Sequence, residues 1–200
     1  MIAAGLVLAL IRKPLTLRST ALLAPFFQKK GWLDKALSLR KKALAISEEK
    51  YGRNHYKIIE HLSGLADIHY AKGDYDKATR LYERALGILE KKFGMSHIEV
   101  SKTLGKLADG YRAQGQNLRA VPLYERALPI FEKELGGSHP TVALCLDSLA
   151  GAYHATGQYD KALPLYKRAL EISQKALGRN HDQSQTVAEH YAFCLQKMNQ

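Results

Sequence analysis

The sequence is poor in the residues that cross-link small secreted domains or build cysteine-based metal centres. Two cysteines, Cys145 and Cys194, occur in 200 residues, and no C-x-x-C pair is present. Both fall within segments that the surrounding pattern predicts to be helical. Small buried thiols are therefore favoured over a disulfide or a metal site.

The sequence also has no hydrophobic run long enough to cross a membrane as a helix. Its apolar start, residues 1–11, is too short, because a span needs roughly 20 residues. Arg12 and Lys13 follow, and no acidic residue precedes Asp34. This pattern fits a short helix that caps the fold, a mitochondrial targeting segment, or a disordered or truncated start. We expect a cytoplasmic protein, with a mitochondrial location as the alternative and membrane contact only through residues 1–11.

The motifs that carry common enzyme chemistry are missing as well. There is no glycine-rich phosphate loop after a strand, no nucleophile elbow and no His-Glu-x-x-His motif. Each carboxylate after residue 13 can be assigned to a helix surface or a loop. The sequence therefore predicts a non-enzymatic protein with no catalytic residues, no cofactor, no metal and no small-molecule substrate.

Positive charge is in excess but unevenly distributed. The formal net charge is +11, and residues 1–50 hold ten Lys and Arg against three acidic residues. The other 150 residues hold twenty against sixteen, so most of the chain is nearly balanced and has no continuous basic stripe. Nucleic-acid binding through the first 50 residues remains an alternative. It predicts a strongly salt-dependent affinity that disappears when residues 1–30 are removed.

What the sequence does contain is an internal repeat with a period of 42 residues. One glycine series consists of Gly31, Gly73, Gly115 and Gly157. A second consists of Gly52, Gly94, Gly136 and Gly178, followed three residues later by His55, His97, His139 and His181. A fixed period of this length predicts an array whose units bury their apolar faces by stacking on one another.

Each unit predicts a pair of amphipathic helices. Leu62, Leu65 and Ala66 recur in the later units at helical spacing, and Ala78 and Tyr82 begin a second stripe after the glycine. The glycine closes the first helix, and alanines allow the two helices to approach closely. We expect the four repeated histidines to start helices rather than bind metal, since ligands would have to converge. Tyr82, Tyr124 and Tyr166 are expected in the core.

These motifs resemble the tetratricopeptide repeat. The matching pattern is Leu62-x2-Leu65-Ala66-x2-His69, followed by Ala78-x3-Tyr82-x2-Ala85. The period of 42, with Pro122-Leu-Tyr-Glu-Arg-Ala-Leu128 and Leu135-Gly-Gly-Ser-His-Pro140, resembles the variety found in kinesin light chains. The resemblance covers residues 14–197. It implies an all-α fold, a right-handed superhelical solenoid of antiparallel helix pairs.

The period also predicts the limits of the repeats. Residues 1–13 form a separate apolar segment, and a degenerate first repeat covers residues 14–55. Regular repeats are expected at 56–97, 98–139 and 140–181, with a half-repeat at 182–200 that caps the array.

The resemblance implies a concave groove lined by the first helix of each repeat. The residues expected to contact a partner there are Asp67, Tyr70, Lys102, Lys106, Asp109, Arg112, Asp147 and His154. Glu60, Ser63, Gly64, Ala71, Gly105, Ala113, Leu144, Ser148, Gly151 and Ala155 complete the three helix faces. Their helical spacing places each set on one face of its helix. The basic side chains would pair with acidic groups of a ligand, and Tyr70 and His154 would offer aromatic contact.

The chain departs from two ligand-binding patterns of related repeats. Kinesin light chains typically carry Asn-Asn before Leu-Ala, where this chain has Ser63-Gly64 in the second repeat. Asp67 and Asp109 stand where a clamp for a terminal carboxylate needs asparagine, and would repel an acidic terminus. We therefore expect a scaffold that binds a protein, as an extended peptide or a helix. A cargo-adaptor fragment like kinesin light chain and a regulatory array of a larger signalling protein are the alternatives.

Overall fold

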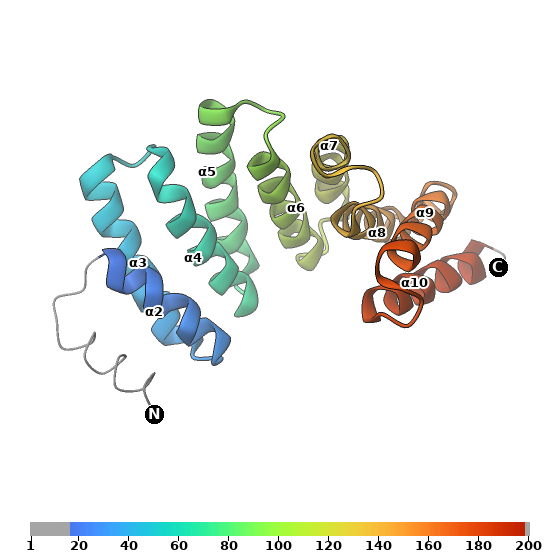
Figure 1. Cartoon of the computed structure of the whole chain (residues 1–200), viewed down its shortest axis with the longest axis horizontal. Coiled ribbons are helices and arrows are strands. Elements are labelled where there is room, and N and C mark those ends of the chain that lie inside the picture. Colours follow the sequence, from blue (N-terminus) through green and yellow to red (C-terminus); the bar gives the residue numbers. More distant parts are fainter. Residues whose placement is uncertain (1–16, 199–200) are drawn as a thin grey trace. The chain divides into compact units, whose positions relative to one another are not determined.

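The computed structural model describes residues 17–198, with side chains from residue 23 onward, and the regular structure in this part is helical (Figure 1). The helices are α2 (Leu17–Lys29), α3 (Leu33–Tyr51), α4 (Ile59–Ala71), α5 (Tyr75–Phe93), α6 (Ile98–Ala113), α7 (Asn117–Leu135), α8 (Pro140–Ala155), α9 (Tyr159–Leu177) and α10 (Asp182–Met198). A short 3₁₀ helix, Tyr56–Ile58, leads into α4. The expectations for residues 1–13 lie outside the described residues.

The helices follow one another as antiparallel pairs. The second helix of each pair, α3, α5, α7 or α9, has 19 residues, and the first helix has 13 or 16. Residues 17–198 therefore confirm the predicted all-α class of stacked helix pairs.

Both glycine series lie where the backbone turns. Gly31, Gly73, Gly115 and Gly157 have φ between 74° and 79°, and the second series has φ between 82° and 91°. These are left-handed conformations that side chains with a Cβ adopt at a cost, so the 42-residue spacing of glycine records the spacing of the turns.

The repeated histidines cap helices, as the sequence predicts. Nδ1 of His97 accepts a hydrogen bond from the backbone N–H of Glu99, with 3.2 Å between the nitrogens, and His139 accepts one from Thr141 at 3.1 Å. His55 and His181 make the same contact, each at 3.2 Å. Each ring satisfies one of the free N–H groups at a helix start.

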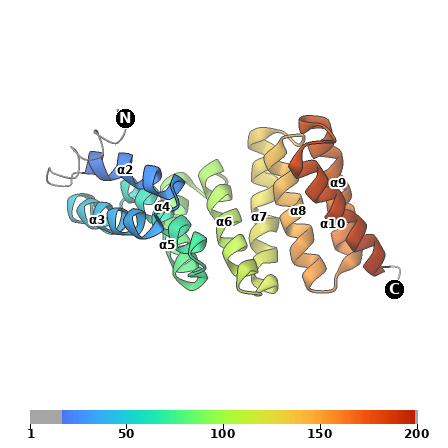
Figure 2. The same cartoon turned by 90° about the horizontal axis from the view of Figure 1, so that it is seen from below.

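The chain forms two compact units that meet in sequence between Lys92 and Phe93. In the first unit, α3 packs against α2 and α4, and Leu62 and Leu65 of α4 share a core cluster with Ala85 and Ile88 of α5. In the second unit, each helix from α6 to α10 packs against the next, and α8 also contacts α6 and α10 (Figure 2).

Small side chains and tyrosines form the core of the helix pairs. Ala66, Ala78 and Ala85 are completely buried, and Tyr82, Tyr124 and Tyr166 are at most 4% exposed. The predicted core positions of the tyrosines are confirmed. Cys145 and Cys194 are free, buried thiols, as their helical positions indicate.

Candidate functional site

In the second unit, the first helices α6, α8 and α10 lie next to one another and present a shared face. We call it the α6–α8–α10 face. It consists of Lys102, Lys106, Asp109 and Arg112 of α6, Leu144, Asp147, Ser148, Gly151 and His154 of α8, and His190 and Phe193 of α10. Six of the eight predicted partner-binding residues are in this set. His190 and Phe193 were missed, although His190 stands 42 residues after Ser148.

Arg112 connects α6 to α8. Its Nη1 donates a hydrogen bond to the backbone oxygen of Ser148 at 3.4 Å. A Cβ added at Gly151 would lie 2.6 Å from the same Nη1, so the missing side chain leaves the space that the guanidinium occupies. Gly151, predicted as part of the groove-lining helix face, thus accommodates an arginine of the neighbouring repeat.

Within this face, side chains of α8 contact α10 at two points. Nδ1 of His190 lies 2.8 Å from Oδ1 of Asp147. The ring of His154 stacks on that of Phe193, with 5.2 Å between the ring centres and 19° between the planes. Burial lowers the pKa of His154, and the positive charges of His190 and Lys197 act in the same direction, so the neutral ring is favoured.

Two of the three aspartates of the predicted groove, Asp67 and Asp109, accept hydrogen bonds from tyrosines. Tyr82 donates its hydroxyl hydrogen to Oδ1 of Asp67 at 2.5 Å, and Tyr124 makes the equivalent bond to Asp109. Burial raises the pKa of Asp109, while the hydrogen bond from Tyr124 and the charge of Arg112 oppose that shift. Burial and the neighbouring Asp109 raise the pKa of Tyr124, which keeps the phenol protonated as a donor. Both carboxylates thus join the two helices of their own repeat.

The side chains of this face that reach furthest into solvent are basic and apolar. Lys102 and Lys106 are exposed, and Nζ of Lys102 lies 2.7 Å from Oε1 of Glu99. Leu144 is 50% exposed and Phe193 is 52% exposed. The α6–α8–α10 face therefore offers ammonium groups beside separate apolar contact points.

In the first unit, the predicted contact residues Asp67 and Tyr70 lie on α4. Tyr70 is 37% exposed, and its ring meets that of Tyr75 edge-on with 5.2 Å between the centres. Asp67 is half-buried under its bond from Tyr82. Tyr70 is therefore the more accessible of the two predicted residues.

A buried arginine lies behind the same face of α4. Arg40 of α3 is only 7% exposed, and a Cβ added at Gly64 would lie 2.7 Å from its Cζ. Nη1 of Arg40 is 3.6 Å from Oε1 of Glu60, and neither Nε nor Nη1 makes a hydrogen bond to any described residue. Arg40 was not predicted as a site residue, although it stands 42 residues before Tyr82, where the other repeats have tyrosine.

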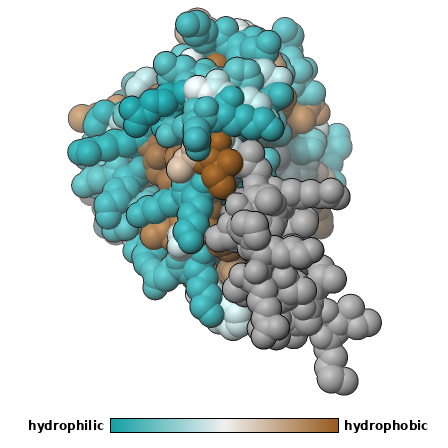
Figure 3. Space-filling view, turned by 90° about the vertical axis from the view of Figure 1, so that its left-hand side faces the viewer, coloured by the Kyte–Doolittle hydropathy of each residue, from teal (hydrophilic) through white to brown (hydrophobic). Residues whose placement is uncertain are grey.

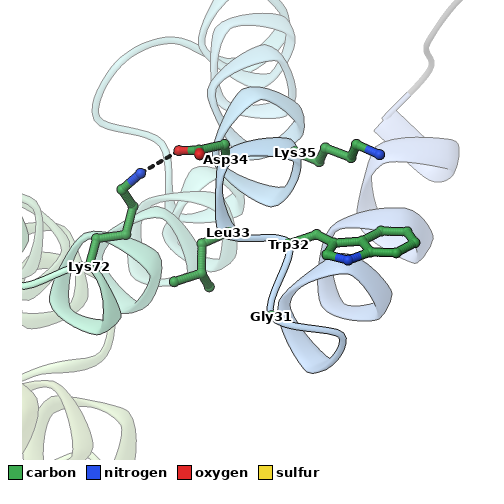
Figure 4. A pocket seen from close by; sticks show the side chains of 6 residues that line it. All are labelled: Gly31, Trp32, Leu33, Asp34, Lys35 and Lys72. Carbon is green, nitrogen blue, oxygen red and sulfur yellow. Dashed lines mark hydrogen bonds and ion pairs between the residues drawn. The ribbon is translucent and has the colours of Figure 1, made fainter.

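A surface depression of about 540 Å³ lies at the turn between α2 and α3 (Figure 4). It is lined by Gly31, Trp32, Leu33, Asp34, Lys35 and Lys72. Lys72 forms an ion pair with Asp34, whereas Nζ of Lys35 lies 4.6 Å from the ring centre of Trp32. The single tryptophan of the chain thus lies in a depression that the repeat pattern does not predict.

A second depression, of about 320 Å³, lies at the corner between α3 and α4. His55 stacks between Tyr51 and Tyr56, with ring centres at 5.4 and 4.6 Å. Lys57 lies over the ring of Tyr51 and Lys92 over that of Tyr56. The equivalent of Lys57 in the next repeat is Glu99, so the charge at this corner differs between repeats.

Outside the residues drawn grey, the face seen in Figure 3 carries mostly hydrophilic side chains, with several small hydrophobic areas between them. Across residues 17–198, no helix is long and apolar enough to cross a membrane. The same part of the chain contains no group of His, Cys, Asp and Glu that could hold a metal ion.

Comparison with known proteins matches this architecture. A family model described as tetratricopeptide repeat matches residues 16–91, 99–175 and 149–200. A crystal structure from Podospora anserina, of a putative kinesin light chain with nearly identical TPR-like repeats, is 28% identical with a TM-score of 0.79. The alignment covers 92% of this chain and 87% of that one.

Two further structures share the fold. BtubC (BKLC) from P. vanneervenii is 23% identical over 91% of this chain and 80% of its own, with a TM-score of 0.71. The apo form of RapI is 16% identical over 92% of this chain and 65% of its own, with a TM-score of 0.78. No curated protein sequence matches. With repeat matches over most of its length and helix pairs of the same kind, this chain belongs to the tetratricopeptide repeat family.

Proposed function

We propose that this protein is a non-enzymatic, cytoplasmic scaffold that binds a protein partner as an extended peptide or a helix along the first helices of its repeats. Tetratricopeptide repeats are generally protein-interaction modules, which supports the broader part of the proposal. The α6–α8–α10 face is the binding surface that we assign to the second unit.

One observation carries this assignment. Side-chain contacts join α6, α8 and α10 into one face, and this face still exposes both charged and apolar groups. Arg112, Asp147 and His154 each contact the next first helix, so ligand binding need not order these helices. Lys102 and Lys106 remain exposed, together with Leu144 and Phe193. A ligand that alternates acidic and apolar side chains would complement this surface.

In this proposal the basic residues of α6 are not equivalent, because their contacts differ. Arg112 contacts α8, so its replacement would disturb the face itself. Lys102 pairs only with Glu99 three residues away in the same helix, an exposed contact that contributes little stability. A charge-reversal test should therefore change Lys102 and Lys106 and leave Arg112 intact.

The test is a selection of displayed random peptides on the full chain, followed by titration of the enriched peptides. We expect Lys102→Glu combined with Lys106→Glu to weaken their binding by about tenfold or more, because two attractive charges become repulsive. Lys167→Glu combined with Lys175→Glu, two exposed positions on α9, provides the matched control with the same change in net charge. Peptides that bind the α6 variant as well as the wild type, but not the α9 variant, would contradict the assignment.

The similarity to a putative kinesin light chain favours a narrower second candidate, a cargo adaptor. A cargo adaptor would bind a short segment of a cargo protein, and an additional segment would have to connect it to a motor. Co-purification of the native, full-length protein with a motor subunit would support this candidate, and its absence from motor complexes would argue against it.

A further inference from the structure

The inference concerns Arg40 and the surface of α4 above it, and it rests on the proposed peptide-binding function. We propose that Arg40 is the anchor for a carboxylate of the bound partner in the first unit, and that Glu60 occupies this anchor in the free protein. The partner is thus a peptide with an acidic side chain that comes to lie over Gly64.

The first support is that the guanidinium is buried without sufficient acceptors. Arg40 is 7% exposed, and neither its Nε nor its Nη1 donates a hydrogen bond to a described residue. Removing a charged group from water costs several kcal/mol unless it is paired and hydrogen-bonded. Glu60, at 3.6 Å, is beyond ordinary hydrogen-bond distance. Donors left in this state can be satisfied by an incoming acceptor.

The second support is the shape of the surface around the guanidinium. Gly64 lacks the side chain that would displace it, since a Cβ there would lie 2.7 Å from Cζ and 2.8 Å from Nε. The equivalent positions in the later repeats are Lys106, Ser148 and His190, and all three later repeats have tyrosine where the first has Arg40. Arg40 and Gly64 therefore depart from the repeat together, because the missing side chain of Gly64 leaves the space that the guanidinium occupies.

The third support is a route from solvent. The side chain of Glu60 is 70% exposed, yet its carboxylate approaches Nη1. A ligand carboxylate can reach the same edge of the guanidinium by the same route. Glu60 is held weakly, because an exposed partner at this distance gains little Coulomb energy. The group that already approaches is a carboxylate, whose two oxygens match the planar fork of arginine.

The neighbouring His61 does not neutralise the site. It is 7% exposed, and burial lowers its pKa; the charge of Glu60 opposes this shift, and the charge of Arg40 adds to it. Neutral His61 leaves Arg40 as the charge to be compensated. Glu60 is therefore the resident competitor of a ligand carboxylate, and its removal should favour binding.

The experiment observes the Arg40 Nε–H signal of the full chain by ¹H–¹⁵N NMR, assigned with Arg40→Lys. The probe is glutamate blocked at both ends, with blocked glutamine as the uncharged comparison. We expect a saturable shift with the glutamate probe only. Glu60→Gln should lower the midpoint by about two- to fivefold, the range measured for exposed ion pairs. Gly64→Ala should abolish the response, whereas Gly87→Ala, a helical glycine with open space around it, should preserve it.

Three results would overturn the proposal: no saturable shift, an equal response to blocked glutamine, or a higher midpoint in Glu60→Gln. Tighter binding of inorganic phosphate than of the glutamate probe would also overturn it, since the site would then not be a carboxylate anchor. The peptide selection that tests the surface of α6 can succeed or fail whatever the outcome of this NMR measurement. A response at Arg40 without any enriched peptide would retain the carboxylate site and reject only the peptide-binding function.

Discussion

The first and second units fill one equivalent buried position in different ways. In the second unit the position holds Tyr124 and Tyr166, and Tyr124 donates its single hydroxyl hydrogen to Asp109 of its own repeat. The first unit holds Tyr82 at one such position and Arg40 at the other, and Arg40 extends to Gly64 of the following repeat. A phenol has one donor to satisfy, whereas a guanidinium has five. The difference indicates that tyrosine at this position stabilises a helix pair, while Arg40 leaves hydrogen-bond donors for a ligand.

The largest expected effect comes from removing the tyrosine hydroxyl in the second unit. Tyr124→Phe leaves the buried Asp109 without its donor, and we expect a loss of about 3 kcal/mol, near the upper end for unsatisfied polar groups. Tyr82→Phe removes the equivalent donor from Asp67, and we expect a loss of the same kind in the first unit. Urea unfolding monitored by hydrogen exchange in each unit would measure both. No measurable loss in either variant would contradict this stabilising role of the tyrosine hydroxyls.

The stability lost in Tyr124→Phe should also depend on pH. Burial raises the pKa of Asp109 in the folded state, and loss of the Tyr124 hydrogen bond would raise it further. A raised folded-state pKa contributes stability at low pH that is lost as the pH rises through that pKa. The deficit of Tyr124→Phe should therefore shrink between pH 7 and pH 4. A deficit that grows on acidification would exclude Asp109 as its cause.

The next largest effect is expected when Arg40 is replaced by the tyrosine that the other repeats have at this position. Arg40→Tyr makes the first repeat resemble the others, and we expect it to stabilise the first unit by about 2 kcal/mol, because a buried and poorly paired charge is removed. Slower hydrogen exchange in α3 and α4 would confirm the gain, and faster exchange would show that Arg40 is a structural residue.

A smaller effect separates glycines that accommodate an arginine from glycines that do not. Gly87→Ala and Gly105→Ala should each stabilise their helix by about 0.5–1 kcal/mol, since no atom lies within 4 Å of the added Cβ. Gly64→Ala and Gly151→Ala should give no gain or a loss of about 1 kcal/mol, because each displaces a guanidinium. Adding Arg40→Tyr should convert Gly64→Ala to a stabilising change. Thermal unfolding of the double-mutant cycle would measure that coupling.

The smallest expected effect is the loss of stability at acidic pH that arises from His61 and His154. Burial lowers the pKa of His61 in the first unit and of His154 in the second. A lowered folded-state pKa gives stability that is present above the unfolded value of about 6.5 and is lost as the pH falls through the folded value. His61→Thr, which introduces the residue found at the equivalent Thr103, should reduce this acid sensitivity in the first unit only. An unchanged pH profile of hydrogen exchange in α4 would contradict it.

Local features of the fold were predictable from the sequence because they depend on residues close together in the chain. Glycine at the turns, histidine at the helix starts and alanine between paired helices recur with the period, and each has one physical cause. The site was predicted less completely. The sequence places Arg112 and Asp147 on first-helix faces, but it does not indicate that they contact Ser148 and His190 of neighbouring repeats.

By itself, then, the sequence determined the helices, their pairing and the faces that they present, since a strict period repeats the same local chemistry. Only the tertiary structure decided which polar side chains on those faces remain available. Asp109 is held by Tyr124 and Arg112 reaches into the space at Gly151, whereas Arg40 retains free donors beneath Gly64. These outcomes depend on the volume and the hydrogen-bonding groups that one helix leaves for its neighbour. Because they involve residues about 15 to 40 positions apart, helical periodicity does not encode them.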